Sequence, residues 1–150
     1  MLFRSEAVVD HVFRALEQGR GGWIATLNLD YVRRCAVEPD TQKLFSDVDL
    51  VVADGMPLLW AARLQGTPLP DRVAGSDLVW LLAERAAQEG RSLYLLGGNP
   101  GAAEAARTQL HARWPQLRIA GVSSPRVSAD RKSTRLNSSH SSVSRMPSSA

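Results

Sequence analysis

The sequence predicts an α/β fold in which a mostly parallel sheet carries helices on both faces. Short apolar runs rich in Val, Ile and Leu alternate along the chain with longer segments of helical periodicity, and Gly or Pro separates most of them. This alternation favours parallel pairing, because a helix supplies the crossover between parallel strands. With 150 residues, 44% of them hydrophobic, the chain is large enough for one domain with its own core.

Most predicted elements have a local signal for their start or end. Ser5 can cap a first helix, and Pro39 ends the second one. Pro57 suits the first turn of a later helix, and Ser76 or Asp77 caps the next. The predicted helices span residues 5–18, 29–38, 41–46, 57–64, 78–88 and 102–114. The predicted strands span residues 23–28, 49–53, 92–96 and 117–122.

Residues 131–150 differ in composition from the rest of the chain. They include eight serines, four Lys or Arg and no acidic residue. Without them, 14 basic and 15 acidic side chains remain, so the formal charge of +3 becomes −1 and gives no indication of nucleic-acid binding. The segment has no apolar periodicity to order it, and it resembles a sequencing or vector artefact. We therefore expect an α/β domain at residues 1–130, with a sheet incomplete on its C-terminal side, and a disordered tail at 131–150.

Several classes of protein are excluded by single residue types. One cysteine, Cys35, rules out an internal disulfide and a cysteine-rich zinc site. His11, His111 and His140 do not occur at metal-ligand spacings, so no metal site is expected. No apolar run approaches the ~20 residues of a membrane span. The N-terminus also lacks the basic-then-apolar pattern of a signal peptide, and we expect a cytoplasmic protein.

Polar or glycine-rich turns follow three of the predicted strands. They contain Thr26 with Asn28, Asp54 with Gly55, and the Gly-Gly-Asn-Pro-Gly sequence at 97–101. Because the carboxyl ends of parallel strands meet at one edge of a sheet, we expect these turns to converge there. The third turn opens a helix whose free N–H groups and dipole favour a phosphate, although such turns are more often only connections.

Asp54 and Arg72 each have two interpretations. Asp54 is either the N-cap of the helix that starts at Pro57 or a catalytic carboxylate, and its position alone favours neither. Arg72 lies in a loop between prolines and an Ala-Gly-Ser sequence. It is either a solvated side chain or a bidentate clamp on a diphosphate.

Four motifs occur in a fixed order along the chain. They are Thr-Leu-Asn at 26–28, Ala-Asp-Gly-Met-Pro at 53–57, Arg-Val-Ala-Gly-Ser-Asp-Leu at 72–78 and Leu-Leu-Gly-Gly at 95–98. This series resembles glycosyltransferase family 26, which contains bacterial N-acetylmannosaminyltransferases and enzymes of teichoic acid, enterobacterial common antigen and capsule biosynthesis. The resemblance covers residues 8–122, and four separated motifs are far more specific than any one of them.

The resemblance implies a Rossmann-like transferase that moves an N-acetylmannosamine-type sugar from a UDP donor to a polyprenyl-diphosphate-linked acceptor. It implies inversion at the anomeric carbon and no metal or other cofactor. It implies that Asp54 is the general base, which fits a transfer that needs one base within reach of the incoming hydroxyl. The implied substrate-binding residues are Thr26, Asn28, Arg72, Gly97, Gly98 and Asn99.

The sequence departs from the family in its second half. The family's Gln-Glu-x-Trp-like segment and C-terminal membrane-docking appendage are not found, so we expect little or no activity from this chain. The full-length protein is expected at the inner face of the plasma membrane, and a homo-oligomer is left open.

Two alternatives to the transferase are a dehydrogenase-like nucleotide-binding module and a non-catalytic remnant of the fold. The first lacks a GxGxxG fingerprint. The second does not explain why all four polar positions are kept, namely Thr26, Asn28, Asp54 and Arg72.

Overall fold

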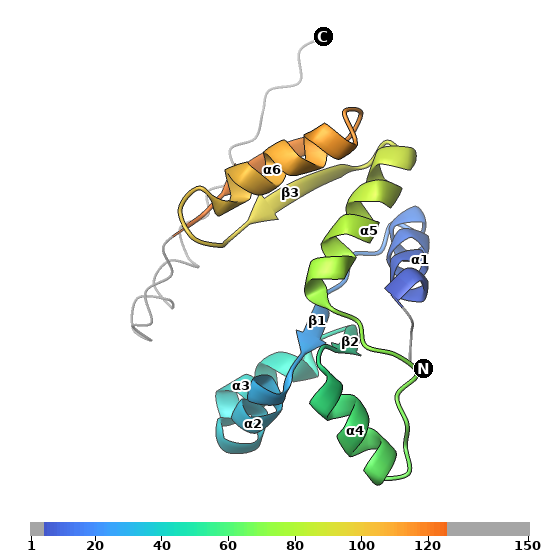
Figure 1. Ribbon diagram of the computed structural model, residues 1–150, viewed down its shortest axis with the longest axis vertical. Helices are drawn as coiled ribbons and strands as arrows, with labels where there is room; N and C mark the ends of the chain where they lie inside the picture. Colours follow the sequence, from blue (N-terminus) through green and yellow to red (C-terminus); the bar gives the residue numbers. More distant parts are fainter. Residues whose placement is uncertain (1–4, 126–150) are drawn as a thin grey trace.

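The computed structural model describes residues 5–125 (Figure 1). That part of the chain contains six helices and four strands, and helices separate each strand from the next. This order confirms the α/β class. The helices are α1 (Ser5–Glu17), α2 (Leu29–Val37), α3 (Pro39–Ser46), α4 (Met56–Leu64), α5 (Gly75–Gln88) and α6 (Ala102–Arg113). The strands are β1 (Ile24–Leu27), β2 (Leu50–Ala53), β3 (Ser92–Leu96) and β4 (Arg118–Ser123). The predicted tail at 131–150 lies outside the described residues.

The four strands form two parallel sheets of two strands each. β1 pairs with β2, with Thr26 opposite Val52, and β3 pairs with β4, with Leu95 opposite Val122. Within residues 5–125 no ladder joins the two sheets, and Figure 1 shows β3 apart from β1 and β2. The parallel pairing is as predicted. The expectation that one sheet edge collects all three turns is wrong, because the turn at Gly97 follows a strand of the other sheet.

Helix α5 lies between the two sheets and shares one core with both of them (Figure 1). Its residues Leu78, Ala83 and Ala86 are buried and pack with Val8 and Phe13 of α1. Partly buried residues from both sheets join the same cluster, namely Ile24, Leu50, Leu93, Leu95 and Ile119. Full burial of a large aliphatic side chain contributes about 1.5–3 kcal/mol. The packing of α1 and α5 therefore holds together two sheets that no hydrogen-bond ladder connects.

Two helix starts differ by more than one residue from the prediction. Pro39 ends α2 as predicted, but it also stands at the start of α3, where the first N–H of a helix has no partner in any case. Helix α5 begins at Gly75, with Ala74 as an N-cap that makes no side-chain capping bond. The prediction that Ser76 or Asp77 caps this helix is therefore wrong, and both residues belong to its first turn.

The helices of the described region are short. The longest, α5, has 14 residues, which at a rise of 1.5 Å per residue corresponds to about 21 Å. Across residues 5–125, no helix combines the length and the apolar character that a membrane crossing requires.

Candidate active site

Asp54 directly follows β2, at the carboxyl end of the first sheet. Its backbone N–H donates to the carbonyl oxygen of Leu27 across 2.8 Å, so the residue is held beside the end of β1 as well. The next residue, Gly55, has φ 126° and ψ 136°, outside the regions open to residues with a side chain. This turn leads the chain away into α4 and leaves the Asp54 side chain 32% exposed at the sheet edge.

The Asp54 carboxylate faces the N-terminus of α5 and does not cap α4. Its Oδ2 accepts a long hydrogen bond, 3.4 Å, from the backbone N–H of Gly75, the first residue of α5. The N-cap of α4 is Gly55, and no side-chain capping bond is made there. The interpretation of Asp54 as the cap of the helix at Pro57 is therefore wrong. The positive end of the α5 dipole favours a negative charge at this position.

Arg72 lies between two carboxylates. Its Nη1 is 3.7 Å from Oδ1 of Asp54, and its Nη2 is 3.8 Å from Oδ2 of Asp77, in the first turn of α5. The buried neighbour Val73 donates its backbone N–H to the carbonyl oxygen of Ala53 across 2.8 Å, which attaches this loop to the end of β2. Because the Arg72 side chain is 44% exposed, a ligand in solution can reach it.

Thr26 completes this group from β1. A Cβ built on Gly75 would lie 3.5 Å from both Oγ1 and Cγ2 of Thr26, so the strand contacts the start of α5. Thr26 pairs with Val52, and side chains two residues apart on a strand point to the same face. Thr26 and Asp54 are thus on one face of the sheet. The structure brings Thr26, Asp54 and Arg72 together around Gly75.

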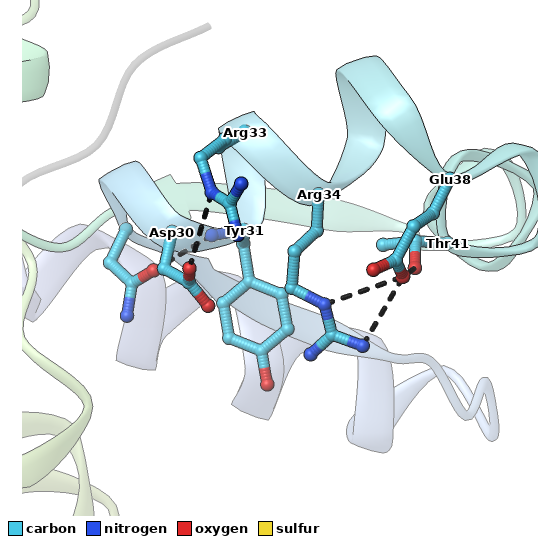
Figure 2. Close-up of polar contacts among 7 residues, drawn as sticks. Asp30, Tyr31, Arg33, Arg34, Glu38 and Thr41 are labelled. Carbon is cyan, nitrogen blue, oxygen red and sulfur yellow. Dashed lines mark hydrogen bonds and ion pairs between the residues drawn. The ribbon is translucent and has the colours of Figure 1, made fainter.

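Asn28 has a structural role at the end of β1. It is the N-cap of α2, and its Oδ1 accepts the backbone N–H of Tyr31 across 3.0 Å. Figure 2 shows the polar network that follows on α2 and α3. Arg34 pairs with Glu38 at 3.3 Å, and the Thr41 hydroxyl donates to the same carboxylate oxygen across 2.7 Å. These contacts hold the bend between the two helices.

The glycine turn after β3 lies at the end of the second sheet. Gly97 and Gly98 have φ of 104° and 78°, which favour glycine. The Gly97 N–H donates to the carbonyl oxygen of Ser123 across 2.8 Å, and the Ser124 hydroxyl donates to the Gly97 carbonyl oxygen across 3.0 Å. These bonds run to β4 and the residue after it. The structure therefore places Gly97, Gly98 and Asn99 on a different sheet from Asp54.

The sequence does not indicate two members of the group around Asp54. Gly75 has no side chain and takes part through its backbone N–H. Asp77 has the position of a helix cap in the sequence, whereas the structure pairs it with Arg72. The sequence signal that could have found this pair is the short spacing between Arg72 and Asp77. An acidic side chain in the first turn of a helix can pair with an arginine in the loop that precedes the helix.

The arrangement suits proton transfer next to an anionic ligand. Asp54 can accept a proton, and Arg72 together with the N-terminal N–H groups of α5 can bind phosphate oxygens. Over residues 5–125, no group of three or more His, Cys, Asp or Glu side chains is arranged to hold a metal ion.

The comparison with protein families decides the relationship of the chain. Residues 2–143 match the model of the glycosyl transferase WecG/TagA/CpsF family. The chain belongs to this family. The matched range extends beyond residue 130, where the predicted domain ends.

A curated relative comes from Bacillus spizizenii strain W23. It is named N-acetylglucosaminyldiphosphoundecaprenol N-acetyl-beta-D-mannosaminyltransferase. The two sequences are 26% identical over 117 residues, which is 78% of this chain and 46% of the relative. The chain thus spans less than half the length of this relative. The family assignment from the four motifs is confirmed.

Proposed function

We propose that this member of the WecG/TagA/CpsF family transfers an N-acetylmannosamine-type sugar from a UDP donor to a polyprenyl-diphosphate-linked sugar in cell-surface polysaccharide synthesis. The name of the B. spizizenii relative supports both the transferred sugar and the acceptor class. The observation that carries the proposal is the meeting of Asp54, Arg72 and the Gly75 N–H at one sheet edge. A base, a cation and a helix N-terminus can together support transfer from a nucleotide diphosphate.

Asp54 is the proposed general base. It takes the proton of the acceptor hydroxyl while that oxygen attacks the anomeric carbon of the donor. The new carbon–oxygen bond forms as the bond to the UDP oxygen breaks, and UDP leaves with the electron pair. This single displacement inverts the anomeric centre and needs no protein nucleophile.

Arg72 and the N-terminus of α5 are the proposed stabilisers of the departing diphosphate. A guanidinium donates in a planar fork that fits phosphate oxygens, and the helix dipole adds a positive potential. These groups supply, without a metal ion, the charge stabilisation that the transition state needs. Thr26 and Asn28 are proposed contacts to the sugar.

Gly97, Gly98 and Asn99 are proposed to contact the nucleoside from the second sheet. The diphosphate of a UDP-sugar separates its nucleoside from the reacting carbon. The group around Asp54 would bind the sugar and the diphosphate, and the turn at Gly97 would bind the nucleoside. This division is consistent with the location of the two groups on two sheets.

We propose that the chain by itself turns over slowly. The side chains of Asp54 and Arg72 are 32% and 44% exposed, whereas a transferase keeps water away from its activated donor. The polyprenyl chain of the proposed acceptor lies in a bilayer. We therefore propose that a protein as long as the B. spizizenii relative contacts the inner face of the plasma membrane peripherally. Any self-association is proposed for that longer protein as well.

Calorimetric titration separates this proposal from a dehydrogenase-like nucleotide domain. UDP and NAD are each titrated into the chain, and we expect UDP to bind and NAD not to bind. Arg72→Gln should weaken the binding of UDP. Arg107→Gln is the matched control, because it removes an arginine that pairs with Glu104 on α6 at 2.9 Å. Binding of NAD without UDP would overturn the proposal.

Single-turnover kinetics test the transfer itself. The chain is mixed in excess with UDP-N-acetylmannosamine and a short-chain polyprenyl-diphosphate N-acetylglucosamine, and products are resolved by mass spectrometry. We expect a disaccharide product that requires both substrates. Release of free sugar at the same rate with and without acceptor contradicts a transferase.

A further inference from the structure

We propose that Asp77 is a positioning residue that holds the Arg72 guanidinium beside Asp54, preset for a diphosphate. The inference rests on the proposed function, which assigns Arg72 to the diphosphate of UDP. It starts from the observation that Arg72 has two ionic partners, one at each Nη atom. Asp54 is the proposed base that takes the proton of the acceptor. Asp77 is therefore the partner that can serve to orient Arg72.

The Asp77 carboxylate is 57% exposed and has a partner at each oxygen. Its residue lies in the first turn of α5, where its backbone N–H donates to the Ala74 carbonyl oxygen across 3.1 Å. The Ser76 hydroxyl lies 3.3 Å from Oδ1 of Asp77, whereas Oδ2 faces Nη2 of Arg72. The two carboxylate oxygens therefore have separate partners. Helix α5 thus carries the carboxylate that orients the Arg72 side chain.

Arg72 needs such an anchor because, apart from its contact with Asp54, the described contacts hold its backbone. Its N–H donates to Oδ1 of Asp71 across 2.8 Å, and the next residue is bonded to the end of β2. Its side chain is 44% exposed and long, so a single contact to Asp54 leaves much rotamer freedom. A second attraction, at the other Nη atom, restricts the direction in which the guanidinium points.

The lengths of the two contacts suit a group that must receive a ligand. They are 3.7 and 3.8 Å, compared with 2.9 Å for the pair of Arg107 and Glu104 on α6. At these distances the carboxylates attract the guanidinium by charge without occupying its N–H groups in short hydrogen bonds. The donors of Arg72 are thus oriented and still available to phosphate oxygens.

The direction in which Asp77→Asn changes the affinity for UDP distinguishes a positioning role from a purely electrostatic one. Asp77→Asn removes a negative charge near an anion site, and by charge alone this change strengthens the binding of UDP. If Asp77 acts by orienting Arg72, the same change weakens it. Asp71→Asn is the matched control, because it removes an equal charge from a residue next to Arg72 whose carboxylate, within residues 5–125, accepts the Arg72 backbone N–H.

The binding experiment is a double-mutant cycle by calorimetry with UDP as the probe. We expect Asp77→Asn to weaken UDP binding by about three- to tenfold, the scale of an exposed ion pair and its ordering. Asp77→Glu should recover most of the affinity, and Asp71→Asn should leave it unchanged or slightly tighter. In the Arg72→Gln background, Asp77→Asn should no longer weaken binding, because the residue it acts through is absent.

A second measurement does not depend on UDP. Nuclear magnetic resonance reports the order of the Arg72 Nε–Hε group in the 150-residue chain without ligand. We expect this group to be ordered in the unsubstituted protein and in Asp71→Asn, and to become mobile in Asp77→Asn. If the unsubstituted chain does not bind UDP, the proposed function fails while this readout still tests the positioning. Unchanged order of Arg72 in Asp77→Asn, or UDP binding that is unchanged or tighter in that variant, overturns the inference.

Discussion

The Asp54 carboxylate and the Gly75 backbone N–H are joined by a hydrogen bond of 3.4 Å. It connects the end of β2 with the first residue of α5, 21 positions further along the chain. Because α5 belongs to the core shared by both sheets, the surroundings of Asp54 depend on that core as well as on its own turn. The length of the bond leaves the carboxylate accessible to the hydroxyl proton of an acceptor.

Asp54→Asn should slow transfer strongly while the fold is retained. Asparagine has the same shape and can still accept from the Gly75 N–H, but it cannot take the proton of the acceptor. We expect the single-turnover rate to fall by about 10²–10⁴-fold, the usual contribution of a general base. Far-ultraviolet circular dichroism should be unchanged. A rate within tenfold of the unsubstituted chain would remove Asp54 from the role of base.

Arg72→Lys should weaken UDP binding by about tenfold although the charge is kept. Lysine lacks the planar fork that binds two phosphate oxygens at once and that reaches both Asp54 and Asp77. The free energy of unfolding should change by less than about 1 kcal/mol, since exposed ion pairs contribute little. Calorimetry and urea denaturation provide the two measurements, and full affinity in the lysine variant contradicts a diphosphate clamp.

Gly55→Ala should destabilise the protein by about 1–3 kcal/mol, because an alanine at φ 126° and ψ 136° is strained. Urea denaturation measures the change. Gly21→Ala is the matched control, since no atom lies within 4 Å of its added Cβ and its φ is not in the positive range. Equal effects at both positions would show that the turn after Asp54 has no special conformation.

Gly121→Ala should disturb the second sheet through Tyr94. The two residues are opposite each other in the ladder, and a Cβ on Gly121 would lie 2.6 Å from Cε2 of the tyrosine ring. We expect a loss of about 0.5–1.5 kcal/mol in the free energy of unfolding, because the exposed ring has to leave its rotamer. In a Tyr94→Ala background the cost should largely disappear, because the ring that clashes is gone. Additive effects in urea denaturation would contradict this contact.

Asn28→Ala should cost about 1 kcal/mol of stability, because it removes the N-cap bond to Tyr31. Asn28→Asp keeps an oxygen acceptor for that bond and should stay within a few tenths of a kcal/mol of the unsubstituted protein. Urea denaturation distinguishes the two variants. If both are equally destabilised, the amide group of Asn28 has a further structural partner.

Most element boundaries were predictable because their signals are local. Pro39 ends α2 whatever the rest of the chain does, since a proline restricts the residue before it. The start of α5 was not predictable in the same way. Ser76 and Asp77 are both good capping residues, yet the helix begins at Gly75 without a side-chain cap. The Gly75 N–H is bonded instead by Asp54, a residue distant in sequence.

The candidate site was predictable in part. Thr26 and Asp54 lie at the ends of adjacent parallel strands, as expected, and the register of the ladder puts them on one face. The pairing of Arg72 with Asp54 was not derivable from either residue, because it requires the loop to be bonded to the end of β2. The partner Asp77 depends on the same long-range contact.

By itself, the sequence determined the α/β class, the approximate bounds of the elements, and the ordered motifs that place the chain in its family. The class and the bounds follow from periodicity, Gly and Pro, which act within a few residues, whereas the family follows from the resemblance of the motifs. Only the tertiary structure decided that the strands form two sheets, that the Gly97 turn lies apart from Asp54, and that the aspartate faces α5. These features depend on which distant segments bury apolar surface against each other. The free energy of that burial cannot be predicted from a local sequence pattern.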